Sequence, residues 1–186
     1  MKLNFFNTTL LLFTSRALDY ITTLIYTPNL SQESNVLVNI LNFGPYLMGV
    51  IQIIGLLVVT FYLSIFFNKK VEIRCDNFYK MSLKQFMGCY HFNDPNRNLT
   101  SILFCSRGAN AYSFSSFIGY TVTWTLIIVG FIVGISSFFL ITNEYYREIY
   151  NQFNITFGLH LLIPFIFLFL SVKFYTIERA KMINGF

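Results

Sequence analysis

The chain has 186 residues, of which 55% are hydrophobic, 19% are aromatic and only 11% are charged. Because soluble globular proteins carry about 25% charged residues, this composition excludes an ordinary water-soluble domain. The formal net charge of +5 does not predict nucleic acid as a direct ligand, since the basic residues flank apolar stretches. The expected solvent is a lipid bilayer.

Four apolar stretches are long enough to cross a bilayer, whose hydrocarbon core takes about 20 helical residues. They lie near residues 4–27, 36–67, 115–141 and 155–176. A long connection of about residues 68–114 joins the second stretch to the third. The sequence therefore predicts an all-α fold: one transmembrane domain over residues 1–186, built as a four-helix bundle.

The first stretch carries two charges near its middle. Arg16 and Asp19 are three residues apart, so they share one face of a helix. An ion pair inside a membrane costs much less than either charge alone. Thr27-Pro28 should end this helix, since proline disfavours the helical conformation in the residue before it. The second stretch then returns antiparallel to the first.

Counting back from this turn brings polar residues of both stretches to one depth. The predicted intramembrane polar seam consists of Arg16, Asp19, Thr22, Thr23, Asn39 and Asn42. One interpretation is that these groups satisfy one another and fix the register of the two helices. The second is that they line a water-filled cavity or ion pathway. The third interpretation is that these groups take part in catalysis.

The second stretch is too long for the bilayer if it is straight, so it should kink at Gly44-Pro45 or protrude into the cytoplasm. In the following loop, Ser82 and Gln85 have the spacing of a capping box. An amphipathic stripe of Leu83, Phe86, Met87 and Tyr90 comes next. This pattern predicts a short amphipathic helix that lies on the membrane surface or packs under the bundle.

The long loop is basic, whereas the two short connections are not. Its basic residues include Lys69, Lys70, Arg74, Lys80 and Lys84. By the positive-inside rule, the loop and both termini should lie in the cytoplasm of a multi-pass protein, with a bacterial inner membrane as the expected location. The loop would contact anionic headgroups or a cytoplasmic protein partner.

Cysteines and histidines give no standard metal pattern. Cys75, Cys89 and Cys105 fall in the loop, where cytoplasmic thiols stay reduced. Together with Asp76 and His91 they match no known ligand spacing, so we expect no metal and no cofactor. His160 stands near the start of the fourth stretch, as an interfacial or proton-responsive group.

The third stretch contains Gly130 and Gly134, a spacing that lets helix backbones approach closely. This GxxxG pattern could pack within the chain or between the subunits of a homo-oligomer. No common catalytic motif is present. The one alternative that we keep as an enzyme is an intramembrane hydrolase using Ser137 and His160.

The run LDYITTLIYTPNLSQESNVLVNILNFG, residues 18–44, resembles a pattern of small bacterial multi-pass membrane proteins. That pattern has the form LDxx[ST]T, then TP[DN]L, then ExN before a glycine. The outer-turn part of it falls on Pro28, Glu33 and Asn35, while Val36 replaces the usual proline. The resemblance implies no activity. In size and plan the chain is also similar to the membrane accessory proteins of type VI-B CRISPR systems, which implies a role in antiviral defence.

The sequence thus favours a non-enzymatic accessory or scaffold subunit that acts by assembly with itself or with a cytoplasmic partner. An oligomeric channel or pore is the first alternative, with the polar seam near the conduction path. A respiratory-chain accessory subunit is the second, since AT-rich organelle DNA would give a similar composition.

Overall fold

The structure is a computed structural model that describes residues 4–28, 44–68, 73, 75, 80–97, 108–153 and 155–183. Every regular element in these ranges is a helix, which confirms the all-α prediction there. The long helices are α1 (Phe5–Tyr26), α3 (Pro45–Asn68), α6 (Ala111–Thr142) and α8 (Ile155–Ile183). The short ones are α4 (Leu83–Phe92) and α7 (Glu144–Gln152).

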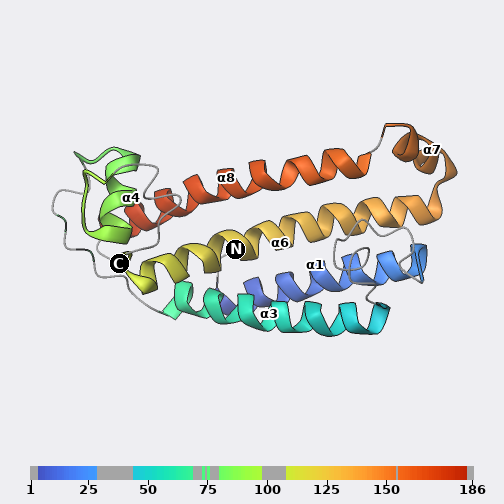
Figure 1. The fold of residues 1–186 in the computed structure, drawn as a ribbon, viewed down its shortest axis with the longest axis horizontal. Helices are drawn as coiled ribbons and strands as arrows, with labels where there is room; N and C mark the ends of the chain where they lie inside the picture. Colours follow the sequence, from blue (N-terminus) through green and yellow to red (C-terminus); the bar gives the residue numbers. More distant parts are fainter. Residues whose placement is uncertain are drawn as a thin grey trace.

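Helix α6 is the centre of the arrangement. It packs on α1, α3 and α8, and the four long helices run side by side (Figure 1). Helices α1 and α6 run in one direction, and α3 and α8 in the other. Helix α4 lies at the end where α6 begins and α8 finishes, and α7 lies at the opposite end. A different short helix therefore lies at each end of the four long helices.

Three of the described helices are long and apolar enough to cross a membrane, namely α3, α6 and α8. Their large side chains face outward, as Leu57 on α3 and Phe165 and Phe169 on α8 do. Helix α1 does not reach that hydropathy, because its polar residues include Arg16 and Asp19. The predicted membrane protein is thus supported by three helices, and the four-helix transmembrane bundle stays an expectation.

Helix boundaries agree with several sequence signals. Helix α1 ends at Tyr26, directly before Thr27-Pro28. In the second stretch, Gly44 is not helical and α3 begins at Pro45. Proline suits a first helical position, where its missing N–H leaves no hydrogen bond unmade. Residues 36–43 lie outside the described part of the chain, so the kink at Gly44-Pro45 stays a prediction.

Helix α4 confirms the predicted capping box. The Ser82 hydroxyl accepts a bond from the Gln85 N–H at 3.3 Å, and the Gln85 side chain accepts one from the Ser82 N–H at 2.8 Å. Phe86 and Tyr90 from the predicted stripe are buried. They join an aromatic core with Phe66, Tyr120 and Phe174, and other residues, from the long helices. Helix α4 therefore packs against the ends of the long helices, as one of the two predicted positions requires.

Cysteine pairing differs from the sequence expectation. Cys75 and Cys89 form a disulfide in the structure, whereas the loop thiols were expected to stay reduced. The bond links the segment before α4 to the buried face of α4, where Cys89 is fully buried. Cys105 and Asp76 lie outside the described residues.

Candidate functional site

Two glycines bring α1 against α6. A Cβ on Gly130 would lie 3.0 Å from the Ser15 carbonyl oxygen, and one on Gly134 would lie 2.8 Å from Leu18 Cγ. A larger residue at either position would therefore require atoms of α1 to shift. The structure thus places the GxxxG pattern against α1 of the same chain. This close packing sets the direction in which the polar face of α1 points.

The charged pair predicted on α1 is formed. Arg16 Nη1 lies 2.8 Å from Asp19 Oδ2, and the two side chains are only 19% and 12% exposed. Thr22 is buried on the same helix, where its hydroxyl donates to the Leu18 carbonyl at 2.8 Å. Both charges are therefore inside the protein, where a partner is needed to offset the loss of hydration.

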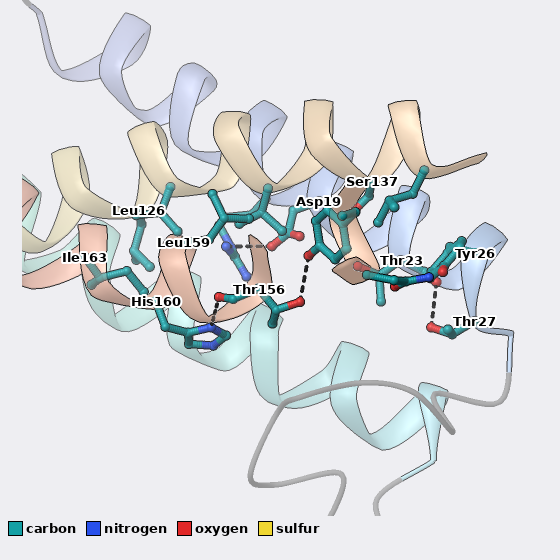
Figure 2. A pocket seen from close by; sticks show the side chains of 16 residues that line it. Asp19, Thr23, Tyr26, Thr27, Leu126, Ser137, Thr156, Leu159, His160 and Ile163 are labelled. Carbon is teal, nitrogen blue, oxygen red and sulfur yellow. Dashed lines mark hydrogen bonds and ion pairs between the residues drawn. The ribbon is translucent and has the colours of Figure 1, made fainter. Parts of the chain in front are cut away.

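A pocket of about 560 Å³ lies beside this pair, between α1, α6, α7 and α8 (Figure 2). We call it the α1–α8 pocket. The wall from α1 is polar and consists of Arg16, Asp19, Thr23, Tyr26 and Thr27. The facing wall from α6 and α8 is mainly apolar and includes Leu126, Val129, Val133, Leu159 and Ile163. Its volume falls in the range of small-molecule sites, about 300–1,000 Å³.

One hydrogen bond between α7 and α8 and another within α8 lie at one edge of the pocket. The Thr156 hydroxyl donates to the Tyr150 hydroxyl oxygen at 2.9 Å. His160 Nδ1 lies 2.7 Å from the Thr156 carbonyl oxygen, so this nitrogen carries the proton and Nε2 can accept. Pro164 has no N–H, so the His160 carbonyl lacks its usual helical donor. His160 therefore offers Nε2 as an acceptor beside the pocket.

Ser137 and His160 both line the pocket, as the hydrolase alternative requires. The described contacts join His160 to Thr156 and show no hydrogen bond between His160 and Ser137. A nucleophile and its base should lie within hydrogen-bond reach, although apo geometry can be looser. The described residues also contain no group of three His, Cys, Asp or Glu side chains that could hold a metal.

A second polar cluster, the α4 cap network, lies at the opposite end of the long helices. It consists of Tyr90, His91, Ser113, Tyr175 and Glu178, all of them buried. His91 Nδ1 lies 3.0 Å from the Ser113 hydroxyl, and Nε2 lies 2.8 Å from the Tyr175 hydroxyl. The Tyr90 hydroxyl donates to Glu178 at 3.1 Å.

The Ser113 contact fixes the tautomer of His91. The Ser113 hydroxyl donates its hydrogen bond to the Asn110 carbonyl at 2.8 Å, so it must accept from His91 Nδ1–H. Nε2 then accepts from the Tyr175 hydroxyl. Burial lowers the pKa of His91 to about 4, which keeps the ring neutral. Burial, and then the nearby Glu178 carboxylate, raise the pKa of Tyr90. With its proton on Nδ1, His91 cannot act as a base toward Ser113.

Other predicted site residues are placed less centrally or fall outside the described part. Pro28 is exposed just after α1, and Lys80 and Lys84 are exposed beside and on α4. Thr23 lines the α1–α8 pocket. The residues outside the described ranges are Glu33, Asn35, Asn39, Asn42, Lys69, Lys70 and Arg74.

Sequence reasoning missed the α7 side of the pocket. Residues 142–154 were expected to be a plain connection, but Asn143 caps α7 by accepting from the Tyr146 N–H at 3.0 Å. Asn143 followed by Glu144 was a usable start signal, since both residues favour helix N-termini. Helix α7 supplies Tyr150 and Asn151 to the pocket.

The chain matches no protein-family model, no curated protein and no solved structure. The resemblance over residues 18–44 stays an expectation.

Proposed function

We propose that this chain is a non-enzymatic, multi-pass membrane protein that acts as an accessory subunit and binds a small molecule in the α1–α8 pocket. The supporting observation is that a charged, ligand-sized cavity lies toward one end of the long helices. At the other end, Phe66, Tyr120 and Phe174 pack in the aromatic core. A cavity at one end with a packed aromatic core at the other suits binding, whereas conduction needs water from both sides.

In this proposal α1 is the fourth membrane span. Its 22 residues reach about 33 Å at 1.5 Å per residue, enough for a hydrocarbon core of about 30 Å. Its charged residues turn inward, while Phe6, Leu10 and Ile25 are exposed on the other side. An amphipathic span of this kind has low mean hydropathy and still presents an apolar face to lipid.

The α4 end faces the cytoplasm and provides the surface for a protein partner. Exposed Lys84 on α4 and nearby Lys80 belong to the basic loop, and the positive-inside rule puts such loops in the cytoplasm. The cap network and the aromatic core hold α4 against α8, so this surface is preorganised. The pocket then opens toward the outer side of the membrane, with α7 beside it.

An oligomeric channel is the second candidate, because the Arg16–Asp19 pair lies near the middle of α1 beside a cavity. Ion flux through purified protein in liposomes separates the two functions. We expect no flux from the wild type at any protein-to-lipid ratio. Flux that disappears in Asp19→Asn, in a variant that melts normally in detergent, would replace binding with conduction.

A further inference from the structure

We propose that the α1–α8 pocket binds a zwitterionic amphiphile, a molecule with an ammonium group and a phosphate on one short headgroup and an apolar body. This inference rests on the proposed function, in which the pocket is a binding site. It follows from the charge, the hydrogen-bonding capacity and the two-sided character of the lining.

The described residues of the lining carry no net charge. Arg16 and Asp19 are its formally charged side chains, and they lie 2.8 Å apart. A ligand with a net charge would enter this buried site without a counter-charge, which is costly away from water. A zwitterion brings one charge of each sign. It can contact both side chains and leave the site neutral.

The anionic group of the ligand fits Arg16. A guanidinium has five N–H donors, and the contact with Asp19 is made through Nη1. The remaining donors can hold a phosphate in the two-point geometry that arginine favours. The Tyr150 hydroxyl accepts from Thr156, so its own proton is available for a further bond to the same group.

The ammonium group fits the acceptors around the pocket. The Asp19 carboxylate lines the pocket and supplies the negative charge that an ammonium group would face. His160, which also lines the pocket, adds its Nε2. Figure 2 shows Asp19 and His160 among the side chains that surround the pocket.

The apolar wall fits the body of an amphiphile. Helices α1 and α8 both pack on α6 but not closely on each other, and the pocket occupies the space between them. Val133 and Leu159 face this space from α6 and α8, opposite the polar wall of α1. A headgroup against α1 and an apolar part against α6 and α8 would satisfy both walls. The shared chemistry is found in an aminophospholipid and in a soluble glycerophosphoethanolamine.

The test is a thermal melt of the purified protein with three probes. These are phosphatidylethanolamine, phosphatidylglycerol and soluble glycerophosphoethanolamine. We expect phosphatidylethanolamine to raise the melting temperature of the wild type in a saturable manner, and phosphatidylglycerol to have at least tenfold weaker affinity. An equal response to the two lipids would overturn the proposal. Saturable binding of the soluble probe would assign the ligand to the aqueous phase, and a response to the lipid alone would assign it to the membrane.

Two variants test the site itself. Val133→Phe fills the apolar wall without touching a charge, so it should abolish the response to phosphatidylethanolamine. Val58→Phe makes the same change at an exposed position of α3 and is the matched control. Asp19→Asn leaves the lining with a net positive charge, so the preference should shift at least tenfold toward phosphatidylglycerol. A full response in Val133→Phe would disprove the site even if Asp19→Asn fails to fold.

Failure of this inference can be told apart from failure of the proposed function. Ion flux in the wild type would overturn the binding role whatever the lipid response is. A wild type without flux that does not distinguish the two lipids would overturn the ligand class alone.

Discussion

His91 Nε2 lies 2.8 Å from the hydroxyl of Tyr175, and this bond ties α4 to the end of α8. The other ring nitrogen is bonded to Ser113 at the start of α6. One neutral imidazole thus connects three helices at the α4 end. The network works only while His91 carries a single proton, because both nitrogens become donors in the protonated ring.

Stability should therefore fall in mild acid. The pKa of His91 is lowered from 6.5 to about 4 by burial, so the unfolded state takes up a proton first as pH falls. The contribution of His91 is complete above pH 6.5. It decreases by about 1.4 kcal/mol per pH unit between pH 6.5 and 4. Melting curves in detergent across pH 4–8 measure this slope.

The matched variant is His91→Gln, which has no titratable ring. It should be less stable than the wild type at pH 8 and should lose less stability between pH 6.5 and 4. Glu178→Gln serves as a second control, because Glu178 is the carboxylate of the network and accepts a hydrogen bond from Tyr90 at 3.1 Å. An identical pH slope in wild type and His91→Gln would remove His91 as the source.

The Arg16–Asp19 pair predicts a coupled pair of substitutions. Asp19→Asn or Arg16→Met alone leaves one charge inside the protein, and each should destabilise it by about 2 kcal/mol because the site is partly hydrated. The double variant should cost less than the sum of the two single variants. Thermal melts of the four proteins form the cycle. Strict additivity would show that the two charges do not stabilise each other.

The charged pair on α1 was predictable from the sequence, but the helix that its polar face meets was not. The three-residue spacing put Arg16 and Asp19 on one helical face, and the structure pairs them. The predicted partners of this pair, Asn39 and Asn42, lie outside the described residues. The described contacts turn the polar face of α1 toward α6 and the pocket, because Gly130 and Gly134 admit α1 closely. The GxxxG spacing was visible in the sequence, but the sequence did not show which helix would pack against it.

Sequence signals were reliable where a feature depends only on residues close to one another in the chain. The Ser82–Gln85 capping box and the helix end before Thr27-Pro28 are examples. Contacts between distant residues left no local pattern. His91 and Tyr175 are 84 residues apart, and nothing in either neighbourhood marks the other as its partner. The α4 cap network therefore became visible only in the structure.

The loss of stability caused by Gly→Ala substitutions should depend on which atoms the added methyl group would contact. In Gly119→Ala the added carbon would overlap the backbone carbonyl of Tyr62, which cannot rotate away. We expect a loss of about 3 kcal/mol and a clear fall in melting temperature. Gly134→Ala meets the flexible Leu18 side chain and should cost less. Gly55→Ala is the control, because no atom lies within 4 Å of the added carbon. An equal effect at all three positions would contradict the packing of α3 on α6.

The Cys75–Cys89 pair tests the orientation of the protein in the membrane. A basic loop predicts a cytoplasmic α4 end, where thiols stay reduced, while the structure joins these two cysteines. We therefore expect the bond to be open in cells and to close when the purified protein is oxidised. Closing this loop of about 15 residues should stabilise the folded protein by about 3 kcal/mol. Oxidised and reduced samples should accordingly differ in melting temperature.

Thiol counting in cells decides between the two orientations. Cells are quenched in acid and the protein is alkylated under denaturing conditions, because Cys89 is fully buried. The chain has three cysteines, so the cytoplasmic orientation gives three adducts by mass spectrometry. A single adduct would mean that the disulfide exists in the cell and that the α4 end faces an oxidising compartment. Cys75→Ser, which cannot form the bond, should give two adducts in either case and calibrates the measurement.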